Sequence, residues 1–319
     1  MGAPDEFCDF EKMVPIVGDD VPLDCDYGPT DVPLSRCVGA LSYARYGLGE
    51  GLAELKRTGV NPLAYGFIGS TDTHNGTPGA VSEKAYEGHA GRQSTTPEGR
   101  LTPRSIGGRT VRANPGGLAG VWAQENTRDA IFDAMQSKET FATSGPRIQP
   151  RFFSAESFPD DIYSRADLLA QAYDAGLPMG GEIIGATSAE FLFKASQDPE
   201  GNNLERIQVV KGLSEGEGEY GQAVYDVAKS SNPSPLDLDT CRPGAGEATF
   251  CRTWRDPEFD PVQSAAYYMR VLEVPSWRWS HQQCLALPEG ERPENCSAPD
   301  IPKAIQERAW SSPIWTLPE

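Results

Sequence analysis

The segment LAYGFIGSTDTH, residues 63–74, joins a short apolar run to a polar motif, and the predicted fold is built outward from it. Its apolar part, residues 63–70, follows a predicted helix and the turn residues Gly59 and Pro62. A short apolar run in this position is typical of a strand that is buried on both faces of a parallel sheet. The sequence therefore predicts a β/α unit here.

Helical patterns lie on both sides of the predicted strand. Leu48 and Leu52 share one face of a helix that is predicted over residues 41–57. A second helix is predicted over residues 126–137, with Asn126 as its N-cap. The first part of the chain is therefore expected to be of the α/β class.

Beyond a strand predicted at residues 140–143, the pattern changes from helical to alternating, which places a domain boundary near Arg147. Alternating apolar and polar residues predict further strands at 190–195, 206–210, 224–227 and 267–274. We therefore expect an α/β domain over residues 1–148 and a β-rich, sandwich-like domain with a C-terminal tail over residues 149–319.

Asp72 and His74 follow the predicted strand directly. Residues two positions apart in an extended segment project to the same side, and parallel α/β folds bind ligands at the carboxyl ends of their strands. A carboxylate and an imidazole at that end suit a borderline divalent metal ion such as Zn or Mn. The alternative is a polar turn in which Asp72 and Asn75 bond to the backbone. The spacing leaves both interpretations open.

Residues 70–74, Ser-Thr-Asp-Thr-His, resemble the last metal-binding motif of the PHP hydrolase superfamily, in which a strand ends in Ser-Asp-x-His. Three longer segments, residues 67–79, 117–148 and 306–315, resemble a family of PHP-like proteins that is catalogued as a domain of unknown function and related to the carbaryl-hydrolase-like branch. The resemblance covers nearly the whole chain and is most specific in these three segments.

The resemblance implies a distorted TIM-like barrel with a multinuclear metal centre, usually followed by a β-sandwich. Asp72 and His74 would then be ligands of divalent metal ions (Zn, Mn or Fe). The superfamily also begins with a strand that bears His-x-His, whereas this chain has only His74, His89 and His281. We therefore expect a partial TIM-like (PHP) barrel whose missing ligands lie upstream of Met1, or else a degenerate site.

Weaker candidates lie in and beyond a long polar loop over residues 78–115. His89 could reach the site as a ligand or a proton shuttle, although an exposed loop histidine is the simpler interpretation. Arg92 and Arg109 could bind an anionic substrate, although loop arginines often have no catalytic role. His281 follows two tryptophans in the β-rich half, where we expect a packing or surface role.

Seven cysteines and the absence of any C-x-x-C pair favour disulfide bonds over a redox or zinc motif. Cys241 with Cys251 and Cys284 with Cys296 would each close a short loop, although sequence alone does not give the pairing. We expect a periplasmic or extracellular location with a signal sequence upstream of this chain, because the first residues have neither a basic nor an apolar region. The odd cysteine fits a chain that lacks upstream residues.

The strongly acidic composition argues against two classes of partner. The net charge of -18 and the pI near 4.6 disfavour nucleic acid and anionic lipid, since binding to both relies on Lys and Arg. No apolar run approaches the ~20 residues that span a bilayer. We expect no nucleic-acid partner and no membrane span, and a small-molecule substrate instead.

Two functions remain open at this point. The first is a metal-dependent hydrolase that attacks an ester, amide, carbamate or phosphoester bond with metal-activated water and is incomplete in this chain. The second is a non-enzymatic binding or structural protein of the cell envelope with a degenerate metal site. The acidic charge, the cysteines and the β-rich half favour the second. The sequence carries no signal for the identity of the substrate.

Overall fold

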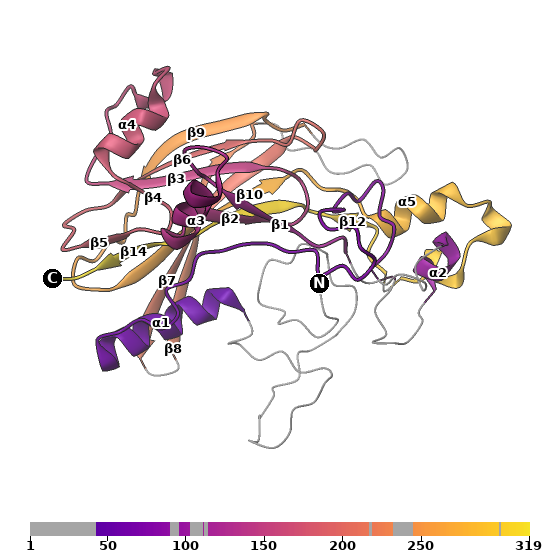
Figure 1. Ribbon diagram of the computed structural model, residues 1–319, viewed down its shortest axis with the longest axis horizontal. Coiled ribbons are helices and arrows are strands. Elements are labelled where there is room, and N and C mark those ends of the chain that lie inside the picture. The colour runs from indigo at the N-terminus through magenta and orange to yellow at the C-terminus, as the bar shows by residue number, and fades with distance from the viewer. Residues whose placement is uncertain are drawn as a thin grey trace.

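Two β-sheets stacked face to face form the centre of the computed structural model (Figure 1). The structure describes residues 43–89, 96–102, 111, 114–216, 219–231, 245–299 and 301–319. The strands of the larger sheet are β1 (Leu118–Val121), β2 (Thr140–Thr143), β5 (Glu182–Ile184), β7 (Leu204–Gly216), β8 (Glu219–Lys229), β10 (Ala265–Glu273), β13 (Arg308–Ser311) and β14 (Ile314–Leu317).

The smaller sheet and the helices complete the set of elements. The strands of the smaller sheet are β3 (Gln149–Ala155), β4 (Leu177–Pro178), β6 (Glu190–Ser196) and β9 (Thr249–Arg255), and β11 (Ser276–Trp277) pairs separately with β12 (Ala304–Ile305). The helices are α1 (Ala44–Thr58), α2 (Pro97–Leu101), α3 (Arg128–Gln136), α4 (Leu168–Ala175) and α5 (Trp279–Ala286), with 3-10 turns η3 (Ile162–Ser164), η4 (Glu289–Glu291) and η5 (Glu294–Cys296).

The larger sheet has the order β1-β2-β13-β10-β14-β5, and β7 pairs with β10 and with β8. The smaller sheet has the order β4-β3-β6-β9. Both sheets are antiparallel except for the parallel pair of β14 with β5. The class is therefore mixed α/β, with many strands and few helices among the described residues.

β10 lies at the centre of the fold, and every residue of it is buried. Tyr267, Met269 and Val271 point into the core between the two sheets, while Ala266 and Tyr268 face the opposite side. Fully burying a large apolar side chain stabilises a fold by about 1.5–3 kcal/mol relative to leaving it exposed. Burial on both faces explains why the sequence of β10 is nearly continuous in apolar residues.

A helix covers the outer face of each sheet (Figure 1). Leu48 and Leu52 of α1 pack on the larger sheet beside Trp315. Leu168 of α4 packs on the smaller sheet. α1 ends at Gly59, whose φ of 79° lies in the left-handed region that favours glycine. The centre of the molecule is thus a helix, two sheets and a helix in layers.

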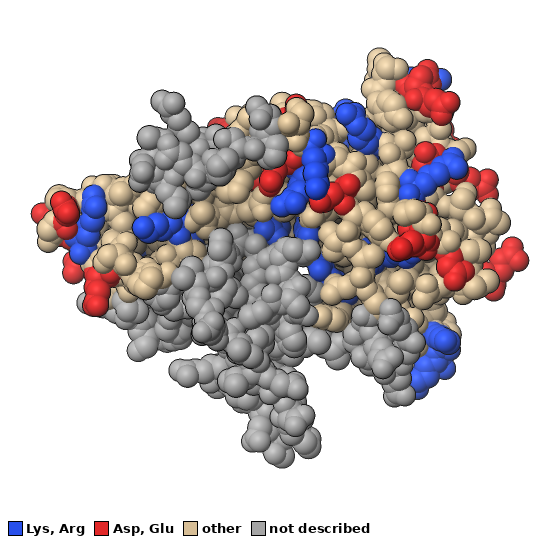
Figure 2. All heavy atoms as spheres, turned by 180° about the vertical axis from the view of Figure 1, so that it is seen from behind, with Lys and Arg blue, Asp and Glu red and all other residues tan. Residues whose placement is uncertain are grey.

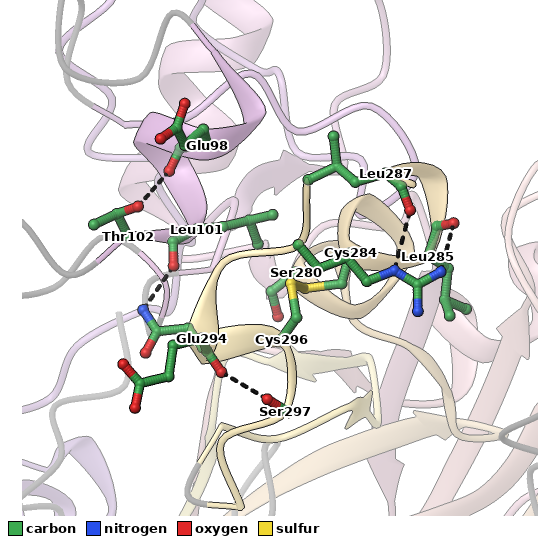
Figure 3. The surroundings of a disulfide bond; sticks show 12 residues. Glu98, Leu101, Thr102, Ser280, Cys284, Leu285, Leu287, Glu294, Cys296 and Ser297 are labelled. Carbon is green, nitrogen blue, oxygen red and sulfur yellow. Dashed lines mark hydrogen bonds between the residues drawn. A yellow bond between two sulfur atoms is a disulfide. The ribbon is translucent and has the colours of Figure 1, made fainter. Parts of the chain in front are cut away.

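α2 and α5 form a smaller lobe at one end of the molecule (Figure 1). The disulfide Cys284–Cys296 joins α5 to η5 there, and Figure 3 shows it beside Leu101 of α2. The Leu101 carbonyl accepts a hydrogen bond of 2.7 Å from the Asn295 side chain. Trp279 is fully buried in the same apolar cluster. The disulfide therefore closes a lobe that also has an apolar core of its own.

Of the two predicted cysteine pairings, the structure confirms Cys284 with Cys296. Cys251 is a free, half-buried thiol in the structure, and burial raises its pKa. Its expected partner, Cys241, lies outside the described residues. A disulfide of this kind fits an oxidising compartment.

Replacing both Cys284 and Cys296 with serine should lower the free energy of unfolding by about 2–4 kcal/mol, because the unfolded chain regains the entropy of an open loop. Denaturant unfolding under non-reducing conditions measures the difference. Cys251→Ser is the matched control and should change stability by less than about 1 kcal/mol, since this thiol forms no disulfide in the structure. Equal unfolding midpoints for the wild type and the double variant would contradict the prediction.

A buried ion pair links the larger sheet to the segment after β9. The Lys211 Nζ atom lies 2.6 Å from Asp256 Oδ2, and the two side chains are 4% and 0% exposed. The Tyr267 hydroxyl donates to the same carboxylate oxygen at 2.7 Å, and the Glu258 backbone N–H donates to the other at 2.9 Å. The Lys211 ammonium also donates to the Glu258 carbonyl at 2.8 Å. These hydrogen bonds offset the desolvation of both charges.

Most of the predicted elements are confirmed. α1 corresponds to the helix predicted over residues 41–57, and β2, β6, β7, β8 and β10 correspond to the predicted strands. The second helix begins at Arg128, because the Thr127 side chain accepts a hydrogen bond from the Ala130 backbone N–H. The predicted N-cap, Asn126, was therefore wrong by one position.

The predicted buried strand at residues 63–70 was wrong. Its residues are half-buried or exposed and belong to no strand. Its backbone pairs with another segment's backbone only at its end, through Gly69 N–H to Leu118 O at 3.1 Å and Gly117 N–H to Ser70 O at 2.8 Å. Before that point, the Phe67 N–H donates to the Ser312 hydroxyl at 2.8 Å. A strand buried on both faces needs neighbours along both edges, and the described residues supply one edge over these few positions.

The predicted TIM-like barrel does not appear in the described residues, whose strands form no closed barrel. The sheets remain open because β1 and β5 end the strand order of the larger sheet without pairing with each other. The division into residues 1–148 and 149–319 stays a prediction. Strands from both sides of it share one sheet, since β2 pairs with β13, with Ala142 opposite Trp310.

Figure 2 shows no segregation of charge over the described part of one face of the molecule. Acidic and basic side chains are interspersed over the described part of the face in Figure 2. The net charge of -18 is therefore not gathered into one acidic patch there. Within the described ranges, no helix has the length and apolar character needed to cross a membrane.

Candidate functional site

Residues 74–89 form a loop whose two ends are held together. The His74 backbone N–H donates to the His89 carbonyl at 2.8 Å, and the Asn75 side chain donates to the Gly88 carbonyl at 2.7 Å. The two imidazole rings meet edge to face, with centroids 4.9 Å apart. A compact loop with adjacent ends is of the Ω type, which is frequently functional. Two histidines fifteen residues apart in the sequence are thus neighbours in space.

Asn75 organises the start of this loop. Its Oδ1 atom accepts hydrogen bonds from the Thr77 backbone N–H at 3.2 Å and from the Thr73 hydroxyl. Its side-chain amide holds the far end of the loop through the bond to Gly88. The polar turn that was one of the two interpretations of this motif is therefore present at Asn75. This turn brings His74 and His89 together, so it is compatible with a role for both histidines in metal binding.

Asp72 occupies an unusual backbone conformation beside the loop. Its φ of 49° lies in the left-handed region, which Asp tolerates better than most residues. The extended geometry predicted for residues 72–74 is therefore absent. Gly116 packs on this turn, where a Cβ atom would lie 2.7 Å from Thr71 Cα, so the close approach requires glycine.

The charges of Asp72 and His74 both act on the imidazole of His89. Burial lowers the pKa of His89, and His74 lowers it further, whereas the Asp72 carboxylate raises it. Asp72 and His74 are exposed, and His89 is half-buried. The site is therefore open to solvent on the side of the motif.

Two imidazoles and a carboxylate have the donor chemistry that Zn, Mn or Fe prefers. The described residues contain no group of three or more His, Cys, Asp or Glu side chains arranged to hold a metal ion. The donor types of Asp72, His74 and His89 thus fit a borderline divalent ion, while their number and arrangement make up only part of a ligand set.

Comparison with known families places the whole chain in one family. The model of the family described as a protein of unknown function, DUF3604, matches residues 1–318. The chain belongs to the DUF3604 family. No curated protein and no solved structure matches it. The match includes the loop at 74–89 and the strands of both sheets, so all of these belong to the region that defines the DUF3604 family.

Of the other candidate residues of this DUF3604 protein, the structure describes His281 alone. His281 lies on α5, where its ring packs edge to face against Trp277 with centroids 5.1 Å apart, in the packing role expected for it. Arg92 and Arg109 lie outside the described residues. Their predicted role in substrate binding stays a prediction.

A cavity of about 630 Å³ in the DUF3604 fold was missed by sequence reasoning. The middle of the loop at 74–89 forms one wall, the turn at residues 198–202 forms another, and Glu273 and Glu307 also line it. These parts are far apart in the chain, so no short sequence motif contains them all. The one available signal was Glu273, a charged residue at the end of the apolar run of β10.

Proposed function

We propose that this chain forms part of a metal-dependent hydrolase of the PHP type, in which Asp72, His74 and His89 are metal ligands. The closure of the loop at residues 74–89 carries the proposal, because it places two imidazoles 4.9 Å apart in the field of a carboxylate. Imidazole and carboxylate are ordinary ligands for Zn, Mn and Fe. The remaining ligands would come from outside the described residues.

The reaction we propose is hydrolysis of an ester, amide, carbamate or phosphoester bond in a small molecule. A bound divalent ion would supply hydroxide near neutral pH and polarise the bond under attack. The described residues of this chain would position the metal ligands. The hydrogen bond between the His74 N–H and the His89 carbonyl joins the two backbones where the imidazoles are in contact, and Gly116 packs on the turn at Asp72.

A fold and a cellular location belong to the same proposal. The three segments that resemble PHP-like proteins support a TIM-like barrel built outside the described residues, because the described strands β1 and β2 are antiparallel and belong to an open sheet. The disulfide Cys284–Cys296 supports a periplasmic or extracellular location, because disulfides persist in oxidising compartments.

Metal retention tests the site. The purified chain is incubated with Zn²⁺ or Mn²⁺ and dialysed, and mass spectrometry then measures the metal ions that remain per chain. We expect the wild type to retain metal and His74→Ala and His89→Ala to lose at least about tenfold in affinity, since even an outer-shell partner of a ligand contributes 10–100-fold. The control His281→Ala should retain metal. Equal retention by all four proteins, or by none, would contradict the site.

Hydrolysis of chromogenic aryl esters, carbamates and phosphoesters tests the reaction itself. We expect turnover that requires added metal, is abolished by a chelator, and falls in His74→Ala while His281→Ala keeps it. A metal-loaded wild type that hydrolyses none of these substrates would count against the hydrolase and in favour of a binding role in the cell envelope.

A further inference from the structure

Three carboxyl groups from distant parts of the chain converge on the cavity. Glu83 comes from the middle of the loop at 74–89, Glu273 from the end of β10, and Glu307 from the position just before β13. Glu273 is 0% exposed and Glu307 is 3% exposed. Glu83 and Glu273 both raise the pKa of Glu307, after the larger effect of its burial, so the three groups are electrostatic neighbours.

Each carboxyl group uses one oxygen to hold the fold. Glu83 Oε2 accepts from the first backbone N–H of α5, and Glu307 Oε2 accepts from the Ser144 hydroxyl. Glu273 Oε2 accepts from the Asn202 backbone and side chain at 3.4 and 3.3 Å. These contacts fix the directions of all three side chains.

The second oxygen of two of these groups has no partner. The Oε1 atoms of Glu83 and Glu273 are buried without a hydrogen bond to any described residue. Gly201, which also lines the cavity, leaves room for one of them, because a Cβ atom there would lie 2.7 Å from Glu273 Oε1. A buried polar atom without a partner costs stability. The fully buried Glu273 therefore offers an acceptor atom at the cavity that a ligand could satisfy.

The carboxyl groups of the cavity are offset only in part by basic side chains. Two buried arginines, Arg278 and Arg308, act on Glu83 and Glu307 respectively, and the pKa of each carboxyl group is still raised. Lys84 and Arg147 line the cavity with exposed side chains. Burial raises the pKa of Glu273 and of Glu83 to about 7 each, and the buried Arg278 guanidinium opposes the rise at Glu83. Burial also holds the pKa of Glu307 well above its usual range. Without a cation in the cavity, these carboxyl groups keep their protons to higher pH than usual.

We propose that this cavity binds a small organic ammonium ion through Glu83, Glu273 and Glu307. An ammonium group has three N–H donors, so it can pair with the free oxygens and relieve the repulsion among the carboxylates. A metal ion fits less well, because the described residues contain no group of three carboxylates arranged to hold one. The volume lies in the usual range of ~300–1,000 Å³ for small-molecule sites. Val81 and Trp277 supply an apolar lining for a carbon chain.

Isothermal titration calorimetry with pentane-1,5-diamine tests the proposal, and pentane-1,5-diol is its neutral counterpart of similar shape. At pH 7.5 the diamine binds and the diol produces no binding heat. Because the carboxyl groups ionise as the ammonium enters, binding releases protons. The release appears as a dependence of the measured heat on the ionisation enthalpy of the buffer.

Variants assign the binding to the three carboxyl groups. Glu273→Gln and Glu307→Gln each weaken the diamine at least tenfold, and Gly201→Ala weakens it without changing any charge. Glu156→Gln removes the same charge from an exposed position and leaves the affinity unchanged. His74→Ala also leaves it unchanged, which keeps the result separate from that of the metal site. Circular dichroism melts identify the variants that are folded.

Three outcomes would overturn the proposal. The first is no diamine heat at millimolar concentration with the folded wild type. The second is equal binding of diamine and diol, which would show recognition of shape without charge. The third is an equal loss of affinity in Glu273→Gln and Glu156→Gln, which would assign the binding to the general negative charge of the surface.

Discussion

Replacing Lys211 with methionine should lower the free energy of unfolding by about 3–5 kcal/mol. The change removes the ammonium 2.6 Å from Asp256 Oδ2 and leaves a carboxylate that is 0% exposed without its cation. The Tyr267 hydroxyl and the Glu258 backbone N–H still donate to that carboxylate, but neither carries a compensating charge. Methionine has nearly the same length, so lost packing contributes little. Urea unfolding followed by tryptophan fluorescence measures the difference.

Two further variants isolate the effect of burial. Lys229, on the neighbouring strand β8, pairs with Asp226 at 2.7 Å, but its side chain is 59% exposed, so Lys229→Met should cost less than about 1 kcal/mol. Lys211→Met combined with Asp256→Asn removes both charges and should be less destabilised than the sum of the single changes. If Lys211→Met and Lys229→Met had the same effect, burial would add nothing to the Lys211 pair.

Glu273→Gln should stabilise the protein by up to about 3 kcal/mol at pH 8 and hardly at all at pH 4, since one pKa unit corresponds to about 1.4 kcal/mol. Burial raises the pKa of Glu273 from 4.5 to about 7. Asn202 lowers it, Asp198 raises it, and Lys84 lowers it. Below pH 4.5 the carboxyl group is protonated in both the folded and the unfolded state. As the pH rises to 7, the unfolded chain releases this proton first, so the stability of the wild type falls across that window.

Denaturant unfolding at a series of pH values from 4 to 8 measures this effect. The difference between wild type and Glu273→Gln should grow between pH 4.5 and 7 and then stay constant. Glu156→Gln is the control, because Glu156 is exposed and its substitution should give no such divergence. A constant difference between wild type and Glu273→Gln at every pH would contradict the prediction.

The local pattern of apolar residues predicted those helices and strands whose faces are buried in the same way from one end to the other. Leu48 and Leu52 predicted α1 because both face the larger sheet, and the apolar run in β10 predicted a strand because both of its faces are buried. Pairing between strands was not predictable from these patterns. β2 and β13 meet with Ala142 opposite Trp310, and nothing in either short segment specifies the other.

The candidate site was predictable in part. Asp72 and His74 stood out because their spacing matches a ligand pair, but the turn at Asp72 was not predicted. His89 was only one loop histidine among several loop residues of interest. Its place beside His74 depends on the hydrogen bonds that close the loop, and these form between backbone groups that every residue carries.

The sequence alone indicated the α1 helix, five strands (β2, β6, β7, β8 and β10), a candidate short disulfide loop and the Asp72/His74 motif, because each depends on residues close together in the chain. The tertiary structure decided the two-sheet architecture, the meeting of His74 with His89, and the acidic cavity. Glu83, Glu273 and Glu307 acquire their chemistry from burial beside one another, and burial depends on contacts between segments that no local pattern records.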